Sequence, residues 1–426
     1  MSERIDNLLV FLREANSPFH AVAAMLRRLE AAGFSAWQPG EPTEPGKGYF
    51  HVRNDSSLIA FRAGKDTASP QSVRLVGAHT DSPNLAVKPI PVKQRSGLVQ
   101  LGVDVYGGAL LNPWFDRDLS MAGRISFVDA EGNMGSALID VARPVAIIPS
   151  LAIHLDREAN QQRSVNPQKD ILPVVAMINA DATFDFPAFL AAHYAEQYPN
   201  AGKIRVLDFE ISLYDTQGAA VIGIDSRFIA SARLDNLLSC YGGLSALIAC
   251  DDRHWNVLVC NDHEEVGSAS AVGAQGPMLF DVLESLSGGG DQGRRLRAEA
   301  LMLSVDNAHA VHPNFSDRHD DSHGPELNRG PVIKINRNQR YATSGEGAAM
   351  LKLLAERCEV PVQSFVMRSD LGCGSTIGPI TASETGIATI DLGVPTLGMH
   401  SVRELAGVDD IGHLHQLLTG FYNRVV

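Results

Sequence analysis

Short apolar runs recur along the chain, each bounded by glycine, proline or polar residues. They cover residues 73–78, 256–260, 301–305 and 389–393. Val, Leu and Ile dominate these runs without regular polar alternation, which is typical of strands that are buried on both faces of a parallel sheet. The pattern therefore predicts a sheet with helices on both sides.

Other segments show a helical or an alternating pattern. Residues 17–33 open with a Ser-Pro pair and end in glycine, as helices commonly do, and an apolar stripe over residues 237–248 predicts another helix. Residues 1–6 carry mixed charge and begin an amphipathic helix rather than a signal peptide. Residues 101–106 and 204–211 alternate apolar and polar positions, which indicates half-buried strands.

These patterns predict an α/β fold with a mixed, largely parallel sheet flanked by helices. A chain of 426 residues has room for two or three domains. With 45% apolar residues, it can build a large core without disulfide bonds.

The composition argues against nucleic-acid-binding, membrane-spanning and disulfide-stabilised classes of protein. The net charge of -13 opposes nucleic-acid binding, which needs a basic face. No apolar stretch reaches the ~18 residues that a membrane span needs. The 5 cysteines are odd in number and form no C-x-x-C pair, so we expect reduced thiols and a cytoplasmic location.

Two adjacent carboxylates follow one of the apolar runs. Glu264 and Glu265 come shortly after residues 256–260. Like charges at contact distance repel, so one member of such a pair would be driven to hold a proton. A divalent metal resolves the conflict when one carboxylate binds it and the other polarises a water. The pair therefore points to a metal site.

Further candidate ligands follow the ends of other predicted strands. His79 and Asp306 come directly after apolar runs. In sheets of this kind, ligands gather beyond the carboxyl ends of the strands. Asp235 precedes the helical stripe over residues 237–248, where it could be an N-cap or a carboxylate that bridges two metals. Both interpretations stay open at this point.

Six short segments together resemble the aspartyl aminopeptidase family, which belongs with the two-zinc exopeptidases. The segments are residues 17–22 (SPFHAV), 77–83 (GAHTDSP), 233–236 (RLDN), 262–268 (DHEEVGS), 338–342 (NQRYA) and 398–404 (GMHSVRE). They run in the family's order over most of the chain. The resemblance implies the zinc exopeptidase fold and a metalloaminopeptidase that prefers N-terminal Asp or Glu.

The resemblance also implies a set of metal ligands. Asp235 would bridge two zinc ions, with His79 and Asp306 completing one site and Glu265 and His400 the other. Zinc accepts this mixture of imidazole and carboxylate. Manganese or cobalt could replace zinc in such an oxygen-rich site.

Other residues receive roles in catalysis from the same resemblance. Glu264 would take the proton of a zinc-activated water and deliver it to the leaving amine. Asp81 would accept the second ring N–H of His79 and fix its tautomer. His154 would reach into a neighbouring subunit's site and help to stabilise the oxyanion. On sequence alone, His154 could equally be a packed or surface histidine.

The distance between His79 and Asp235 indicates an insertion. In simpler two-zinc exopeptidases the first histidine and the bridging aspartate lie close in sequence. We expect a discontinuous catalytic domain over residues 1–91 and 229–426, and an inserted, mostly β domain over residues 92–228. In the resembling family such a domain mediates dimerisation within a homo-oligomer of twelve subunits.

An acidic substrate side chain needs a fixed cation. Lys334, within the strand-like residues 332–336, is the candidate, with Tyr341 as a hydroxyl donor. Further candidates for the substrate pocket are His309, His312, Gly374 and Ser375. The glycine-rich residues 372–376 lack a Walker lysine, so they could present backbone N–H groups to a carboxylate rather than to a nucleotide.

Other functions stay open on the sequence alone. One is an aminopeptidase of broader specificity or a metal-dependent deacylase with the same core. Another is a catalytically silent oligomeric shell. The expected partners are peptide substrates and further copies of the chain.

Overall fold

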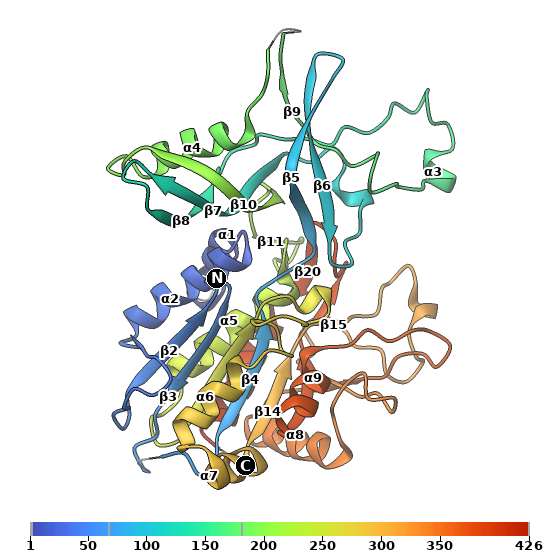
Figure 1. Ribbon diagram of the computed structural model, residues 1–426. Helices are drawn as coiled ribbons and strands as arrows, with labels where there is room; N and C mark the ends of the chain where they lie inside the picture. Colours follow the sequence, from blue (N-terminus) through green and yellow to red (C-terminus); the bar gives the residue numbers. More distant parts are fainter. Residues whose placement is uncertain (1–2, 67–68, 180–181, 425–426) are drawn as a thin grey trace. The chain divides into compact units, whose positions relative to one another are not determined.

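The computed structural model describes residues 3–66, 69–179 and 182–424, which fold into two compact units (Figure 1). Unit 1 comprises the described parts of residues 1–81, 219–399 and 404–426. Unit 2 comprises the described parts of residues 82–218 together with residues 400–403.

Unit 1 is built on a mixed sheet. Among the described residues it has nine strands in the order β1-β2-β3-β13-β4-β14-β18-β16-β17. Their bounds are Ser35–Ala36 (β1), Gly48–Arg53 (β2), Ser57–Arg62 (β3), Arg74–His79 (β4), Asn256–Asn261 (β13), Leu301–Val305 (β14), Val332–Lys334 (β16), Gln363–Phe365 (β17) and Ala388–Gly393 (β18). The central strands β13, β4, β14 and β18 run parallel, whereas β2, β3 and β13 pair antiparallel, as do β16 and β18.

Helices cover both faces of this sheet. They are α1 (Glu3–Glu14), α2 (Pro18–Ala31), α5 (Leu234–Ala249), α6 (Met278–Ser287), α7 (Gly290–Glu299), α8 (Gly345–Arg357), α9 (Ile377–Thr385) and α10 (Val408–Tyr422). Alternate strand residues face opposite sides, so Val76 packs with α1, α2, α5, α8 and α10, whereas Leu75 packs with α6, α7 and α9. Both faces are thus apolar, and the predicted α/β fold is confirmed.

The N-terminal helices follow the predicted signals. Ser17 caps α2 by accepting the N–H of His20 at 3.3 Å, and Pro18 is the first residue of the helix. The helix ends at Ala31, two residues before the predicted end. Within residues 3–66, 69–179 and 182–424, no helix is both long and apolar enough to cross a membrane.

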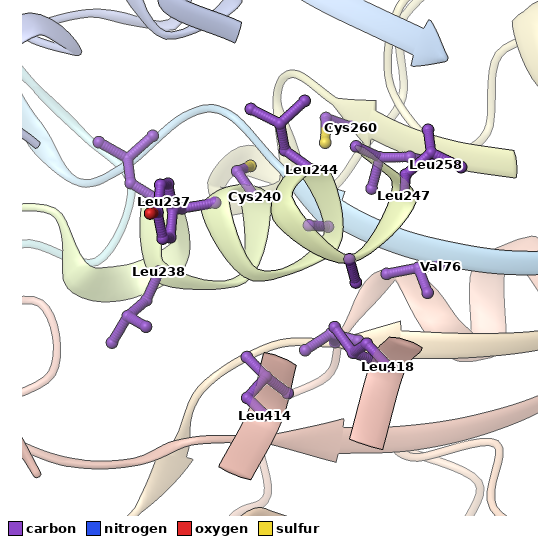
Figure 2. Packing of buried hydrophobic residues seen from close by; sticks show 14 of the residues in the cluster. Val76, Leu237, Leu238, Cys240, Leu244, Leu247, Leu258, Cys260, Leu414 and Leu418 are labelled. Atoms are coloured by element: carbon purple, nitrogen blue, oxygen red, sulfur yellow. The ribbon is translucent and has the colours of Figure 1, made fainter. Parts of the chain in front are cut away.

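Helix α5 packs closely on two sides (Figure 2). A Cβ atom on Gly242 would lie 2.7 Å from Leu414 of α10, and one on Gly243 would lie 2.6 Å from Leu258 of β13. Glycine at both positions therefore lets the helix fit between the sheet and α10. This packing fixes the N-terminal end of α5, where Asp235 lies.

A second sheet of unit 1 joins segments that flank candidate residues. In the described residues its order is β11 (Ala220–Ile222), β12 (Phe228–Ser231), β20 (Glu404–Gly407), β19 (Pro395–Leu397), β15 (Ala308–His309). Strand β12 leads into α5, and β15 begins two residues after Asp306.

Unit 2 contains an antiparallel sheet in the order β8-β7-β10-β5-β6-β9. Its elements are β5 (Asn84–Arg95), β6 (Leu98–Tyr106), β7 (Leu119–Asp129), β8 (Met134–Asp140), α3 (Ala159–Gln162), β9 (Val174–Met177), α4 (Phe186–Gln197) and β10 (Ile204–Asp215). The bounds differ from the predicted 92–228, because β5 continues through residue 92 and β12 pairs with β20 in unit 1. The role of this unit in dimerisation stays a prediction.

Candidate metal centre

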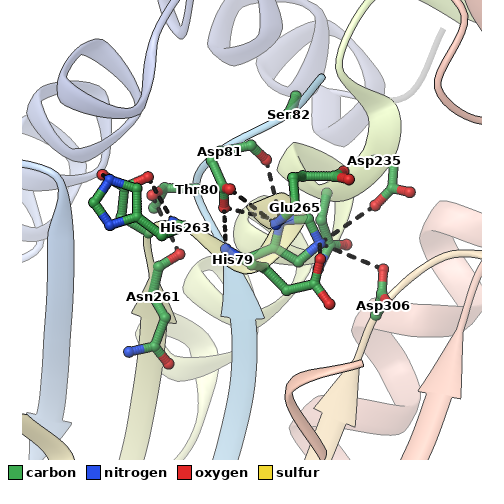
Figure 3. Close-up of polar contacts among 12 residues, drawn as sticks. His79, Thr80, Asp81, Ser82, Asp235, Asn261, His263, Glu265 and Asp306 are labelled. Atoms are coloured by element: carbon green, nitrogen blue, oxygen red, sulfur yellow. Dashed lines mark hydrogen bonds and ion pairs between the residues drawn. The ribbon is translucent and has the colours of Figure 1, made fainter. Parts of the chain in front are cut away.

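Three parallel strands deliver candidate ligands to one edge of the main sheet. His79 is the last residue of β4, and Asp306 follows the last residue of β14. Strand β13 pairs with β4 so that Asn261 lies opposite His79, and a 3-10 helix at Glu264–Val266 begins three residues after Asn261. Because parallel strands end at the same edge, these side chains meet there (Figure 3).

The side chains form a buried cluster around His79. Its Nε2 atom lies 3.4 Å from Asp235 Oδ1, 3.6 Å from Asp306 Oδ1 and 4.0 Å from Glu264 Oε2. One ligand atom each of His79, Asp235 and Asp306 lies within 4.8 Å of the others, and the same holds for His79, Glu264 and Glu265. The structure thus brings together five of the residues predicted for the site.

The cluster places several carboxylates at buried positions. His79, Asp235 and Asp306 expose only 1%, 3% and 7% of their surface. Burial alone would lower the pKa of His79, but the surrounding carboxylates, above all Asp235 and Asp306, outweigh burial and raise that pKa well above its usual value. Burial raises the pKa of Glu264 to about 7. Carboxylates packed in this way attract a cation.

The donor set fits zinc. One imidazole and several carboxylates converge, and zinc binds both types of ligand. Among the described residues, the buried Oδ1 atom of Asp306, which faces His79, accepts no hydrogen bond. A buried acceptor of this kind is costly unless a donor or a cation meets it. The residues present therefore suit the metal that the sequence led us to expect.

Asp81 supports both sides of the cluster. His79 Nδ1 lies 3.0 Å from the backbone carbonyl of Asp81 and 3.4 Å from its carboxylate, so the nearer contact is the carbonyl rather than the side chain. The same carboxylate accepts the backbone N–H groups of Glu264 and Glu265, each at 3.1 Å. Asp81 therefore fixes the histidine ring and the adjacent glutamates together. The contact with the glutamates was not foreseen.

Asp235 is not an N-cap. Asp235 and Asn236 form a kink with non-helical backbone angles, and Arg233 is the residue that precedes α5. Its side chain points toward His79 (Figure 3). The next residue, Asn236, donates from its amide to the carbonyl of Val305 at 2.9 Å, which ties this turn to the end of β14.

Two candidate histidines belong to unit 2. His400 lies in the segment 400–403, where its Nδ1 atom is 3.2 Å from the carbonyl of Gly108. His154 is exposed in the loop between β8 and α3. Zinc ligation by His400 and oxyanion stabilisation by His154 stay predictions.

Lys334 is buried beside the cluster. It exposes only 2% of its surface, so it is not the solvent-facing lysine that a strand position would ordinarily hold. Its ammonium group donates to the carbonyl of Asn307 at 2.9 Å and lies 3.4 Å from Asp306 Oδ2. It also lies 5.2 Å from the ring centroid of Tyr341, where burial raises the pKa of the tyrosine hydroxyl.

His309 and His312 line one pocket of about 290 Å³. Arg318, His319 and Arg368 line it as well, and the sequence had not singled out either arginine. Burial lowers the pKa of His309, with the Lys334 charge acting in the same direction. The lining thus combines two arginines and three histidines with apolar side chains, among them Phe365 and Met367, and includes no carboxylate of the described residues.

Gly374 and Ser375 lie in an exposed loop before α9. Ser375 donates its hydroxyl to the carbonyl of Arg340 at 3.4 Å, which places the loop beside the segment that carries Tyr341. Thr376 then caps α9. A contact of Gly374 or Ser375 with substrate stays a prediction.

Comparisons with known sequences agree with this arrangement. Residues 11–422 match the family model described as aminopeptidase I zinc metalloprotease (M18). The chain is 55% identical over 421 residues to a probable M18 family aminopeptidase 2 of Pseudomonas putida, with 97% of each chain covered. It is 54% identical over 424 residues to a protein of the same description from Azotobacter vinelandii, with 99% of this chain and 98% of the relative covered.

Solved structures with a similar fold include Ape4 in its cryo-EM complex with Nbr1. The TM-score is 0.94 at 36% identity, over 99% of this chain and 85% of that one. The S. cerevisiae mApe1 dodecamer gives a TM-score of 0.84 at 27% identity, over 99% and 96% of the two chains.

Proposed function

This chain belongs to the M18 family of zinc metalloaminopeptidases, and from that premise we propose that it removes Asp or Glu from the amino termini of peptides with two zinc ions per subunit. The observation that carries the proposal is the convergence of Asp235 and Asp306 on His79, with Glu264 and Glu265 alongside.

Five residues would hold the metals. His79 and Asp306 would serve one ion, Glu265 and His400 the other, and Asp235 both. Bound zinc lowers the pKa of a water and polarises a carbonyl, which is the chemistry that peptide hydrolysis needs. Manganese or cobalt would also suit the carboxylate-rich set.

Glu264 is the proposed general base. Its side chain keeps 14% of its surface exposed, more than the 1% of His79, so a water and a peptide can reach it. Its backbone is fixed by Asp81, which orients the carboxylate next to His79. Glu264 would take a proton from the attacking water and pass it to the leaving amine.

The cationic surroundings support a preference for acidic residues. Lys334 lies within 3.4 Å of Asp306, and Arg318 and Arg368 line the pocket that contains His309 and His312. A buried or partly buried cation binds a carboxylate more strongly than an exposed one, since water competes less. Tyr341, Gly374 and Ser375 would contribute further hydrogen bonds.

The proposed enzyme is a homo-oligomer. The relative mApe1 forms a dodecamer, and unit 2 of this chain exposes apolar side chains around His154. Leu151, Ile153 and Leu155 expose 59%, 49% and 75% of their surface. Apolar side chains gathered in one loop are typical of a contact surface, so this loop would bring His154 to a neighbouring subunit.

The reduced state of the cysteines supports our proposal of a cytoplasmic location. All five are free thiols in the structure. Reduced cysteines persist in the cytoplasm, whereas oxidising compartments favour disulfides. Cell fractionation would test the location directly.

A substrate panel tests the proposed function. Aminoacyl nitroanilides of Asp, Glu, Ala and Leu would be assayed after loading with zinc, manganese or cobalt. We expect Asp and Glu substrates to be cleaved at least about 10-fold faster, which corresponds to about 1.4 kcal/mol of transition-state discrimination. Equal rates would favour the broader aminopeptidase, cleavage of N-acyl substrates would favour the deacylase, and no cleavage with any metal would contradict the enzyme.

A further inference from the structure

Glu404 is a buried acid with no role in the proposed reaction so far. It exposes 3% of its surface and is the first residue of β20. Strand β20 pairs antiparallel with β12 so that Glu404 lies opposite Ser231. From Ser231 the chain continues over four residues to Asp235. The strand pairing therefore brings the Glu404 side chain to the turn that carries the candidate bridging ligand.

The contact between them is direct. Glu404 Oε2 accepts the backbone N–H of Asp235 at 2.9 Å, and both groups are buried. Asp235 is the second residue of α5, where a backbone N–H has no acceptor within the helix, so the Glu404 carboxylate supplies one. A hydrogen bond to an ionised acceptor is stronger and more directional than one to a neutral acceptor. It restrains the backbone from which the Asp235 carboxylate projects.

The turn is restrained on other sides as well. Asn236 donates to the carbonyl of Val305, next to Asp306. Arg233 donates to the carbonyl of Ala15 at 3.0 Å at the end of α1. These two contacts hold the residues before and after Asp235, whereas Glu404 holds Asp235 itself.

The choice of a carboxylate is informative. Stability alone would be served by a neutral acceptor, since a second buried acid beside Asp235 adds like-charge repulsion to the cluster. The repulsion is offset where cations bind close by. A glutamate at position 404 therefore suits a turn whose Asp235 carboxylate would bind a cation.

We propose that Glu404 is a positioning residue that holds the Asp235 backbone so that its carboxylate faces His79 and Asp306. The proposal rests on the proposed function, because it takes Asp235 as a metal ligand. Its effect should appear in zinc affinity as well as in turnover. Hydrogen-bonding partners of metal ligands typically contribute about 10–100-fold in affinity or activity.

The experiment compares Glu404→Ala and Glu404→Gln with the wild-type protein. Zinc affinity would be measured by competition with a chromogenic chelator, and thermal unfolding would be recorded with and without zinc. We expect Glu404→Ala to weaken zinc binding about 10–100-fold and to reduce the stabilisation that zinc confers. Glu404→Gln should recover only part of the affinity, because its amide oxygen still accepts the Asp235 N–H but carries no charge.

Asp410 provides the matched control. It is buried in the same unit, and its carboxylate accepts the backbone N–H groups of Asn328 and Gly330 at 2.7 and 2.8 Å. Asp410→Ala should lower stability without changing zinc affinity. Zinc affinity in Glu404→Ala within twofold of that in Asp410→Ala would overturn the proposal.

Two further variants keep the outcome decisive. If Glu404→Ala does not fold, Glu404→Asp replaces it, because the shorter side chain keeps the charge but withdraws the acceptor from Asp235. Unchanged zinc affinity in Glu404→Asp would then overturn the proposal, and a loss would support it. Asp235→Ala tests the underlying function separately: if it binds zinc as the wild type does, Asp235 is not a ligand.

Discussion

The buried acids of unit 1 differ in what their carboxylates face. Asp391 and Asp410 are both 0% exposed. The Asp391 carboxylate accepts the hydroxyl of Thr376 and the N–H of Ala342, each at 2.6 Å, and Asp410 accepts two backbone N–H groups. In these acids the fold directs donors at the carboxylate itself.

In the cluster at the strand ends, hydrogen bonds also hold the backbone next to the candidate ligands, and Lys334 donates to the Asp306 carboxylate at 3.4 Å. Glu404 binds the N–H of Asp235, and Asp81 binds the N–H groups of the two glutamates. The carboxylates of Asp235 and Asp306 meanwhile converge on one nitrogen of His79. The Asp391 and Asp410 carboxylates thus face N–H and O–H donors, whereas those of Asp235 and Asp306 face one histidine nitrogen, as proposed metal ligands would.

The largest effect expected from this difference is on turnover, in Glu264→Gln. Gln keeps the size of the side chain but cannot take a proton from water. We expect kcat to fall by several orders of magnitude, consistent with the roughly 10²–10⁴-fold that general-base catalysis contributes together with its electrostatic effect. Zinc content, measured by elemental analysis, should stay normal. Near-normal kcat would remove Glu264 from the role of base.

The next effect separates the two kinds of acid directly. Asp235→Ala should weaken zinc binding by more than the roughly 10–100-fold expected of a ligand's hydrogen-bonding partner, because a ligand itself is lost. In the metal-free protein it should destabilise less than Asp410→Ala, since it also removes like-charge repulsion. Chelator competition and urea unfolding measure the two quantities. If both variants lowered the free energy of unfolding equally, the distinction between the two kinds of acid would be contradicted.

Much of the cluster could be predicted because parallel strands impose it. His79, Asp306 and the glutamates each follow a run of buried residues, and in-register parallel strands bring such ends together. Asp235 was identified by family resemblance, and its local sequence left open an N-cap that the structure does not show. Periodicity likewise predicted helices on both faces of the sheet.

The supporting contacts could not be read from the sequence. Glu404 and Asp235 are 169 positions apart and meet only because β20 pairs with β12. Arg318 comes from a short 3-10 helix (Ser316–Arg318) and Arg368 from a loop, and no apolar pattern specifies the course of either segment. The bounds of unit 2 were missed for a similar reason, since strand patterns show where a strand lies but not which sheet it joins.

Lys334 lies between the two kinds of acid and sharpens the comparison. It is 3.4 Å from Asp306, and it opposes the rise that burial causes in the pKa of Asp391. If its charge also binds the substrate, Lys334→Ala should lower kcat/KM for Asp and Glu substrates about 10–100-fold more than for Leu substrates. This is the effect expected from the loss of one hydrogen bond to a charged group.

The control for this variant is Arg368→Ala, which alters the same cationic surroundings from the pocket wall. Arg368 exposes 33% of its side chain against 3% for Lys334, so water competes more for its charge and its loss should affect acidic substrates less. An equal loss on acidic and neutral substrates in Lys334→Ala would show that the lysine acts through Asp306 and would contradict its role in specificity.

The last effect concerns the pH dependence of stability at Asp410, away from the cluster. Burial raises the pKa of Asp410 to about 6, against the opposing effect of its two backbone N–H donors. Because this folded-state pKa exceeds the unfolded value of about 3.9, the folded protein takes up the proton first as pH falls. The resulting stabilisation is complete below about pH 4 and is lost as pH rises through 6, a change of about 2–3 kcal/mol for two pKa units.

Asp410→Asn removes this titration. Its amide does not titrate and has one accepting oxygen for the two N–H donors, so the variant should be less stable than the wild type near pH 4. As pH rises to 7, the wild type should lose about 2–3 kcal/mol relative to the variant. Urea unfolding of both metal-free proteins at several pH values measures the difference. Parallel plots of the free energy of unfolding against pH would contradict the prediction. They would mean that Asp410 stays ionised throughout, because its two N–H donors outweigh burial.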